Sequence, residues 1–536
     1  MATLDLLIIG CYFAGILGIG FMCARYNRTS TDYFLASRQM GWFAVGASLF
    51  ATNISSEHFI GLSGSGASTG LAIGHFEWLA CLVLLVLAWV FVPLYHRTGV
   101  FTMPEFLEYR YSLACRLMVT GISLIAYILT KIAVALYAGS LLLEALFGWD
   151  YVTSALAMVI LTGLYTVVGG LRAVIYTDVI QAFILIAGAG VLAWQGLQAV
   201  DGWAGLRARL PPEYFDMIRP ASDPNFPWTG IFLGAPLLGL WYWCTDQVIV
   251  QKALSERSVV EARRGAIFAG YLKILPVFLL VLPGLIAKAL YPNIHGDEAL
   301  VTLAMHLLPP GLMGLLVAAL LAALMSSLSA VLNSSSTLIT VDLYQRLFPT
   351  VSERRLVHVG RLTTGVVILL SILWVPFIPL VSHQLFLYLQ SIQAYLSPPI
   401  AACFLIGLMW HRARARGALL ALVVGFFFGG LRLMLEIIDG LTPIQAPLVR
   451  LLIDPHFLHY AAVMFGICSL ILIGMSLRKE DGLERQPPGK KQVPVEGSVG
   501  YADASSQTRS PERDLVSLIA SFSLIAIVSL LWYTFQ

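Results

Sequence analysis

The sequence has 536 residues, of which 58% are hydrophobic and only 12% are charged. Soluble domains carry about twice that charged fraction, so the composition excludes a soluble enzyme or binding domain. Four long runs contain no charged residue and match the roughly 20-residue length that crosses a bilayer core: Leu6–Ala24, Trp78–Tyr95, Thr153–Gly170 and Val516–Leu531. The net charge of +3 indicates no particular partner. The chain is therefore predicted to be an integral membrane protein surrounded by lipid.

Hydropathy predicts an all-α fold with about fourteen transmembrane helices. In chain order they cover residues 4–24, 41–70, 77–95, 118–147, 151–169, 174–196, 227–251, 265–289, 310–344, 358–378, 383–408, 418–438, 456–477 and 515–535. The first run is not expected to be a cleaved signal peptide, because it opens with Met-Ala-Thr-Leu-Asp rather than with a basic region. It is interpreted as the first span.

The distribution of lysine and arginine predicts the orientation. With the amino terminus outside, 25 of the 33 lysine and arginine residues fall in inside loops or after Leu477, and five fall outside. Lys252 is counted in an inside loop, whereas Lys131, Lys273 and Arg432 fall within spans. Inside loops of membrane proteins are enriched in these residues. Both termini are therefore predicted to lie outside a multi-pass cell (plasma or inner) membrane protein.

The order of the predicted spans and loops divides the chain into seven segments. They are a first transmembrane helix with an inner loop (1–40), a first five-helix repeat (41–196), an outer loop (197–226), a second five-helix repeat (227–408), two peripheral helices (409–477), a cytoplasmic linker (478–514) and a last transmembrane helix (515–536). The linker is rich in proline, serine and charge, which is typical of disorder. The basic run Arg412–Arg416 falls in an inside loop, so topology explains it and no nucleic-acid partner is expected.

The first span of each repeat is interrupted by polar residues. The first contains Ala51-Thr-Asn-Ile-Ser-Ser-Glu-His58 and the second contains Gly239-Leu-Trp-Tyr-Trp-Cys-Thr-Asp-Gln247. Irregular backbone at membrane depth survives only where it lines a cavity or binds an ion. Interrupted spans at corresponding places in two halves therefore indicate a transporter with a central site.

Span 310–344 is unusually rich in hydroxyl side chains. Ala323, Ser326 and Ser327 share one face of about one helical turn. Hydroxyls and unpaired carbonyls are ligands for a hard cation such as sodium. The alternative, with about equal weight from composition alone, is that the serines allow close helix packing. The unwound stretch Ala51–Ile54 as a second half of the cage favours ion binding.

Ionisable residues inside spans are functional candidates, because an unpaired charge at the midplane costs at least about 2.5–3.5 kcal/mol. Glu77 and Lys273 could neutralise each other and still offer donors and acceptors, to which Asn53 and Gln390 add neutral amides. This mixture suits a neutral polyol better than a carboxylate. The alternative makes Glu77 an interface residue and Lys273 a snorkelling one.

Three further features of the sequence allow more than one interpretation. Trp241–Trp243 lies in the middle of a span, which favours a stacking gate over an aromatic belt. Asp178 is either an ion ligand or a plain helix N-cap. Lys131 has no evident partner nearby except Glu144, and its role stays open. Nucleotide-binding loops, zinc motifs and nucleophile elbows are absent from the sequence, so no enzyme is expected and transport must draw on an ion gradient.

The chain resembles the sodium/solute symporter family, and within it the sodium/glucose cotransporter branch. The resemblance runs in order from about residue 1 to 477. It is carried by Ala51–Gly61, Phe76-Glu-Trp78, Thr102-Met-Pro-Glu105, Gly169-Gly-Leu171, Ile175-Tyr-Thr-Asp178, Trp241–Gln251, Gly270-Tyr-Leu-Lys273, Met325-Ser-Ser-Leu328, Asn333-Ser334, Leu389-Gln-Ser391 and Pro398–Ala402.

The resemblance implies a LeuT-like core of inverted five-helix repeats and a co-transported sodium ion. It implies a sodium site at Ala51, Ile54, Ala323, Ser326 and Ser327. The sugar-site positions of the family fall on Asn53, His58, Glu77, Tyr242, Trp243, Lys273 and Gln390. Asp178 and Ser329 match positions that accompany a second sodium ion in related members, so two ions per sugar are a hypothesis.

Two departures affect the expected substrate. Gly239 replaces a polar side chain and Gln393 replaces a smaller residue, so preference among glucose, galactose, inositol or another polyol is open. The function expected is sodium-driven import of a glucose- or galactose-like sugar by alternating access. The alternatives are sodium-coupled transport of another small solute, such as inositol, a carboxylate or an amino acid, and a sugar-gated sodium sensor or conductance. The sequence does not predict an oligomeric state.

Overall fold

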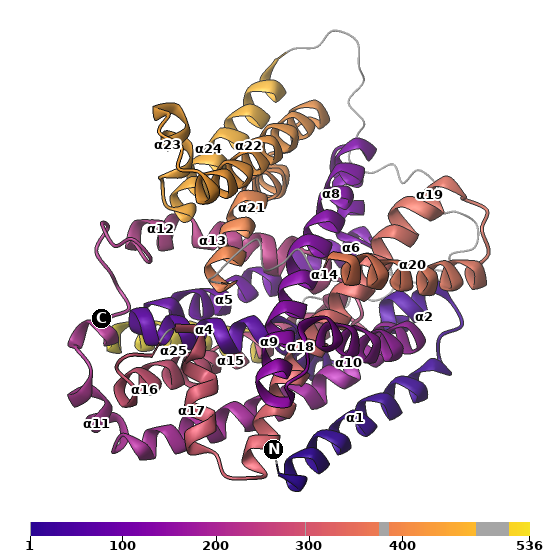
Figure 1. Cartoon of the computed structure of the whole chain (residues 1–536). Coiled ribbons are helices and arrows are strands. Elements are labelled where there is room, and N and C mark those ends of the chain that lie inside the picture. Colours follow the sequence, from indigo (N-terminus) through magenta and orange to yellow (C-terminus); the bar gives the residue numbers. More distant parts are fainter. Residues whose placement is uncertain (1, 295, 375–384, 479–513, 536) are drawn as a thin grey trace.

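The computed structural model describes residues 2–294, 296–374, 385–478 and 514–535. The described residues form helices joined by short connections, as Figure 1 shows. Within them, ten helical stretches are long and apolar enough to cross a membrane. Hydrocarbon cannot hydrogen-bond to peptide groups, so apolar segments fold into helices that satisfy these groups internally. The all-α membrane prediction is confirmed, whereas the count of fourteen spans is not reproduced, because neighbouring spans run together and the interrupted ones form short helices.

The first half of the chain begins with α1 (Thr3–Ala24) and the interrupted helix α3 (Trp42–Asn53) and α4 (Ser56–Thr69). The helices that follow are α5 (His75–Val86), α6 (Val92–Thr98), α7 (Met103–Arg110), α8 (Leu113–Ala126), α9 (Ala133–Phe147) and α10 (Tyr151–Ala199). Single π-helical turns, at Leu87–Phe91 and Tyr127–Ile132, join α5 to α6 and α8 to α9.

A kink at Gly170 divides α10 into two arms that correspond to the predicted spans 151–169 and 174–196. Gly170 has φ 61° and ψ −164°, a conformation that favours glycine. A Cβ at this position would also lie 2.7 Å from the Tyr33 carbonyl oxygen. The bend therefore needs glycine for both its backbone angle and its close contact.

The second half contains a matching interruption. Helix α13 (Ala235–Gly239) leads into a π-helical turn, Leu240–Thr245, and α14 (Gln247–Ala253) follows after the extended residue Asp246. The other helices of this half are the short α12 (Trp228–Leu233) and α19 (Gln345–Leu347) and the longer α15 (Val259–Leu272), α16 (Leu282–Leu290), α17 (Ala299–Leu307), α18 (Leu312–Thr337), α20 (Glu353–Trp374) and α21 (Leu385–Met409).

Helix α18 forms the centre of the bundle. Most of its side chains are buried, and α1, α3, α10 and α20 all pack against it. The backbone amides of Gly311 and Gly314, at its amino end, donate to the Asp5 carboxylate of α1 at 2.7 and 2.8 Å. Helix α18, which carries the hydroxyl-rich segment, thus packs against α10 and α3 and is fixed to α1 at its amino end.

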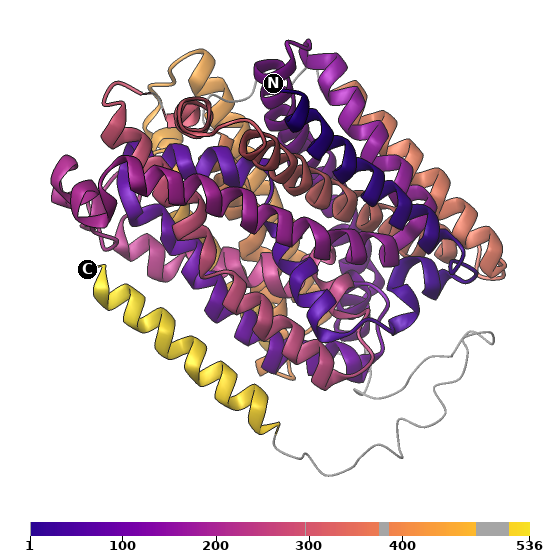
Figure 2. The same cartoon turned by 90° about the horizontal axis from the view of Figure 1, so that it is seen from below.

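Later helices lie at the periphery. α22 (Ala415–Leu441), α23 (Pro447–Ile453) and α24 (Phe457–Leu477) gather beyond α21 at one side of the molecule (Figure 1). α25 (Leu515–Thr534) lies along the outside of the bundle in Figure 2. It is attached through Tyr271, which donates to the Ala520 carbonyl at 2.7 Å, and through Trp89, which donates to Ser521 at 2.9 Å.

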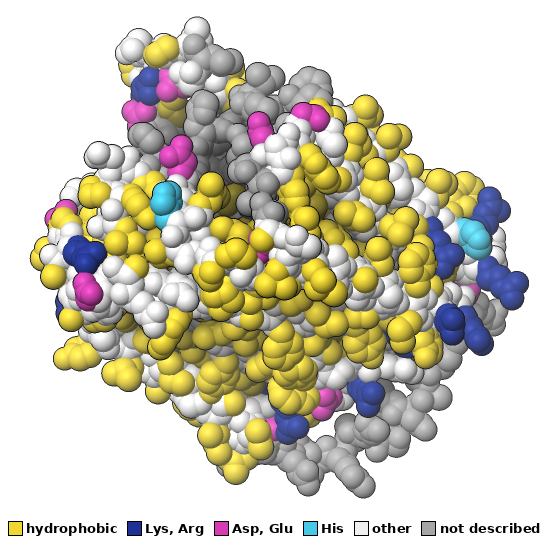
Figure 3. Space-filling model, turned by 60° about the horizontal axis from the view of Figure 1, so that its bottom comes forward, with side chains coloured by type: hydrophobic (Ala, Val, Ile, Leu, Met, Phe, Trp, Pro, Cys, Tyr) yellow, Lys and Arg dark blue, Asp and Glu magenta, His cyan; other side chains and the backbone are white. Residues whose placement is uncertain are grey.

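The surface in Figure 3 is largely apolar, and lysine and arginine gather near its edges. Large apolar side chains exposed on the surface of the protein include Phe183, Leu362 and Leu470, which are 60%, 68% and 72% exposed. A soluble monomer rarely exposes apolar patches beyond a few hundred Å². The surface therefore fits a protein with lipid around it.

The loop between α14 and α15 buries a carboxyl group. Glu256 is 1% exposed, and among the described residues neither of its carboxylate oxygens has a hydrogen-bond partner. Burial, with the nearby charge of Glu261 as a second cause, raises the pKa of Glu256 to about 9. The side chain is therefore protonated at neutral pH.

We expect Glu256→Gln to stabilise the protein in a pH-dependent way. The folded protein keeps this proton while the unfolded chain releases it, so Glu256 lowers stability as the pH rises from 4.5 to about 9. The melting temperature of the purified variant should exceed that of the wild type by several degrees near the upper end of this range and match it near the lower end. Glu213→Gln, at an exposed position, is the control. An equal shift at both ends would contradict the expectation.

Candidate functional site

The first interrupted helix turns its backbone out of helical geometry at two residues. Ile54 has φ −81° and ψ 104°, and Ser55 has φ −114° and ψ −178°. The His58 amide donates to the Ser55 carbonyl at 3.0 Å. Within the described part of the chain, no hydrogen bond reaches the carbonyl oxygens of Ala51 and Ile54. The predicted interruption is confirmed, and it leaves buried oxygens that can accept a donor or a cation.

The two interruptions meet at one cavity, called the central pocket. It is lined by Thr52, Asn53, His58, Phe76, Glu77, Leu79, Ala80, Lys131, Ala235, Leu238, Gly239, Tyr242, Trp243, Val248, Lys273, Ser327, Val331, Leu389, Gln390 and Gln393. All seven residues predicted to bind the substrate are in this set. They come from α3, α4, α5, the C-cap of α15, α21 and the π-helical turn before α14, so the fold brings together residues far apart in sequence.

A buried ion pair spans the pocket. The Lys273 ammonium donates to the Glu77 carboxylate and, at 2.5 Å, to the Asn53 side-chain oxygen. Lys273 and Glu77 side chains are 1% and 3% exposed, and His58 Nε2 lies 3.9 Å from Glu77 Oε1. Lys273 directly follows the last residue of α15, but its buried ammonium is paired with Glu77 and does not snorkel to the membrane surface. Its charge is held inside the protein, where the pair presents both donors and acceptors.

A second ion pair resolves the open question of Lys131. Its ammonium donates to Asp246, the extended residue that starts α14, and not to Glu144. Asp246 also accepts from the Tyr127 hydroxyl and, at 3.1 Å, from the Val248 amide. The Lys131 ammonium lies 4.8 Å from the centre of the Tyr242 ring. Sequence reasoning missed Asp246 because its partner is more than a hundred residues away, although its place at the break was visible.

The predicted sodium-binding residues of α18 face the broken end of α3. Ser327 donates to the carbonyl oxygen of Thr52 at 2.8 Å, and Ser327 also lines the central pocket. Ala51, Ile54, Ala323 and Ser326 are fully buried beside it. A hydroxyl of α18 thus lies at the broken end of α3, and hydroxyl and carbonyl oxygens are ligands that a hard cation such as sodium takes.

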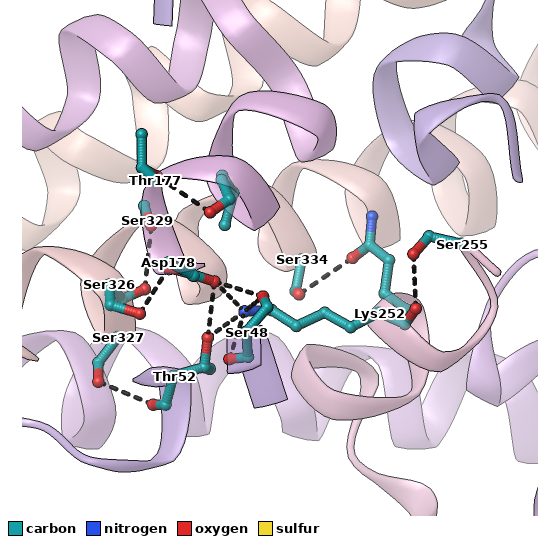
Figure 4. A network of polar contacts seen from close by, with 12 residues as sticks. Ser48, Thr52, Thr177, Asp178, Lys252, Ser255, Ser326, Ser327, Ser329 and Ser334 are labelled. Carbon is teal, nitrogen blue, oxygen red and sulfur yellow. Dashed lines mark hydrogen bonds and ion pairs between the residues drawn. The ribbon is translucent and has the colours of Figure 1, made fainter. Parts of the chain in front are cut away.

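Asp178 lies inside the second arm of α10, about two turns after Gly170, so it is not a helix N-cap. Its Oδ1 accepts from Ser326 at 2.6 Å. Its Oδ2 accepts from Ser48 and from Thr52 at 3.2 Å, as Figure 4 shows. The carboxylate therefore joins α10 to both α3 and α18 in a network of buried polar side chains.

Lys252 corrects the sequence interpretation. It was assigned to an inside loop, but it lies in the last turn of α14 and is 1% exposed. Its ammonium donates to Asp178, to Thr52 and to the Ser48 hydroxyl at 2.7 Å (Figure 4). Ser329, expected beside Asp178, donates instead to the Ser326 carbonyl at 2.9 Å. The four-carbon stem lets a residue at the end of a span reach inward, which hydropathy does not detect.

Comparisons with known proteins decide the family. The profile of the sodium:solute symporter family matches residues 33–425. The chain belongs to this family. It is 40% identical over 514 residues to sodium/glucose cotransporter 4 of Danio rerio, which covers 88% of this chain and 78% of that protein. It is 37% identical over 542 residues to the human sodium/myo-inositol cotransporter, with 92% and 74% covered.

Solved structures agree on the fold. A sodium-coupled sialic acid symporter in a substrate-bound, outward-open state matches with a TM-score of 0.76 and 23% identity, covering 89% of this chain and 98% of that one. A nucleobase-cation-symport-1 family transporter matches with a TM-score of 0.55 and 15% identity, covering 84% and 96%. The fold is thus the LeuT-like fold of sodium symporters. The protein is a multi-pass membrane transporter that couples a solute to sodium, and it is not an enzyme.

The Lys273–Glu77 pair gives a stability prediction. Removal of one partner from a buried ion pair leaves an uncompensated charge and costs about 3–5 kcal/mol. We expect Lys273→Met alone to lower the melting temperature of the purified protein markedly, and the double variant Lys273→Met with Glu77→Gln to recover most of the loss. The exposed pair of Arg209 and Asp201 supplies the control, and Arg209→Met should change little. A double variant as unstable as the single one would contradict this reasoning.

Proposed function

We propose that the protein is a sodium-driven symporter that imports a glucose- or galactose-like monosaccharide by alternating access. The observation that carries the proposal is the central pocket, in which an acid, a base and amides converge beside two aromatic rings. Hydroxyl groups of a sugar can donate to Glu77 and accept from Lys273 at once, while the apolar face of the ring packs on Tyr242 or Trp243. Relatives named for glucose and for myo-inositol support a polyol as the substrate class.

The seven proposed substrate-binding residues are Asn53, His58, Glu77, Tyr242, Trp243, Lys273 and Gln390. We further propose that one sodium ion binds the carbonyls of Ala51, Ile54 and Ala323 with the hydroxyls of Ser326 and Ser327. Ser327 touches both the pocket and the Thr52 carbonyl. An ion bound there would fix the broken end of α3, from which Asn53 reaches the pocket. Sodium would therefore complete the substrate site before the sugar enters.

A second sodium ion between Asp178 and Ser329 is the alternative to this one-ion stoichiometry. The buried carboxylate supports it, and the ammonium of Lys252 beside the same oxygen stands against it. Each charge that crosses the membrane contributes about 2.3 kcal/mol per 100 mV. The ion count therefore sets how steep a sugar gradient the transporter can build.

The topology remains part of the proposal. Residues 41–196 and 227–408 would form the two inverted repeats, and both termini would lie outside the cell membrane. The excess of lysine and arginine in one set of loops supports this orientation. Labelling of single cysteines placed near each end with a reagent that does not cross the membrane would test it.

Two alternatives keep the same sodium site. A different small solute, such as inositol, a carboxylate or an amino acid, would use the same pocket with different contacts. A sugar-gated sodium conductance would bind sugar without accumulating it. Uptake into liposomes that hold a sodium gradient separates all three: uphill accumulation of a monosaccharide supports symport, competition by a solute panel identifies the class, and sodium flux without accumulation would exclude symport.

Ser327→Ala should weaken the sodium site. The variant removes one of the hydroxyl ligands from a cage of few oxygens, so we expect the sodium concentration for half-maximal uptake to rise at least several-fold. The wild-type sugar affinity should return at saturating sodium. Ser336→Ala is a matched control on the same chain segment, because its hydroxyl donates to the Gly360 carbonyl away from the pocket. Unchanged sodium dependence in Ser327→Ala would remove this residue from the cage.

Gln390→Ala should weaken the substrate site without affecting the fold. Its amide lines the pocket and is not part of a buried ion pair, so the melting temperature should stay close to that of the wild type. Loss of a hydrogen bond to an uncharged hydroxyl costs about 0.5–1.5 kcal/mol, so the apparent sugar affinity should fall about two- to tenfold. Wild-type sugar affinity would exclude Gln390 from substrate binding.

A further inference from the structure

The environment of Lys252 resembles a cation site in its chemistry. Four oxygens of three residues surround its ammonium: the Ser48 carbonyl at 3.2 Å, the Ser48 hydroxyl at 2.7 Å, the Thr52 hydroxyl and the Asp178 carboxylate. A carboxylate, two hydroxyls and a carbonyl are also the ligands that a hard metal cation takes. The Lys252 and Asp178 side chains are 1% and 0% exposed.

Charge limits this place to one cation. Asp178 is the carboxylate that the ammonium contacts among the described residues, so the pair is neutral as it stands. A sodium ion added beside Oδ2 would lie next to the ammonium in a region of low dielectric, where like charges repel strongly. Lysine is suited to this place because its charge is compact and its stem is long. Sodium and the ammonium therefore exclude each other at Asp178.

We propose that the Lys252 ammonium is a tethered cation that takes the place of a second sodium ion, so that the wild-type protein binds one sodium ion with its substrate. This inference rests on the proposed function, because it assumes the first sodium site beside Ser327. In this proposal Lys252 sets how many sodium ions the protein binds. This role is separate from the substrate pocket and from the first sodium site.

The two cation places are connected through one serine. The Ser326 hydroxyl donates its hydrogen to Asp178 Oδ1, so its lone pairs point away from Asp178. A serine oriented in this way can offer an oxygen to a sodium ion on its other side. With its charge compensated by Lys252, Asp178 thus positions a ligand of the first site without taking an ion itself.

The experiment counts bound sodium in the full-length protein. Purified protein in lipid nanodiscs is titrated with radioactive sodium to saturation, and bound ions per chain are measured. We expect one ion for the wild type and two for Lys252→Gln, because the amide leaves the Asp178 oxygens to a cation. Lys252→Arg keeps a positive charge and should bind one. The double variant Lys252→Gln with Asp178→Asn removes both charges and should return to one.

The outcomes separate the two levels of the proposal. No bound sodium in the wild type would reject the sodium symport function itself. Two ions in the wild type would overturn the role of Lys252 and leave symport intact. One bound sodium ion in a folded Lys252→Gln variant would mean that the Lys252–Asp178 pair is only a structural contact. That result would also overturn the inference.

Stability provides a second measurement. If sodium replaces the ammonium, Lys252→Gln should melt at a higher temperature in sodium chloride than in choline chloride, by more than the wild type does. A melting temperature of the variant that returns toward the wild-type value only in sodium chloride would support the inference. A melting temperature that stays low in both salts would contradict it, because sodium would then be unable to replace the ammonium.

Discussion

Each charge inside this protein must be compensated where hydrocarbon surrounds the bundle, and this constraint organises the centre of the fold. Three lysine–carboxylate pairs meet it: Lys273 with Glu77, Lys131 with Asp246, and Lys252 with Asp178. Each pair links an interrupted helix to a neighbouring segment. Lys273 also donates to Asn53 of α3, Lys252 of α14 also donates to Ser48 of α3, and Lys131 binds Asp246 at the start of α14. The pairs thus hold the short helices α3 and α14 in place, where broken backbone alone would leave them weakly attached.

Much of the fold was predictable because lipid imposes a simple rule on sequence. Long charge-free runs predicted helices, and polar residues in the middle of a span predicted the breaks that the structure has near Ile54 and Asp246. The number of helices was less predictable. Hydropathy cannot separate a break that ends a helix from a kink within one, such as that at Gly170, because both depend on local backbone angles.

The candidate site was predictable where residues lie in the breaks or resemble family motifs, and all seven proposed substrate residues line one pocket. The missing part is the set of partners. Nothing local in the sequence joins Lys131 to Asp246 or Lys252 to Asp178, since each pair forms only when distant helices pack. Lys252 was misassigned because a window average reads a lysine at the end of a span as a loop charge, while its flexible stem allows it to point inward.

The attachment of α25 has a mechanical consequence. Most of this helix faces lipid, and Tyr271, through which it is held, precedes Lys273 by two residues on the chain. A membrane of different thickness would tilt an exposed helix of this kind. The strain would pass through the tyrosine to the segment that carries a pocket lysine. A change in membrane thickness would therefore act on the position of Lys273 through the hydrogen bond of Tyr271 to α25.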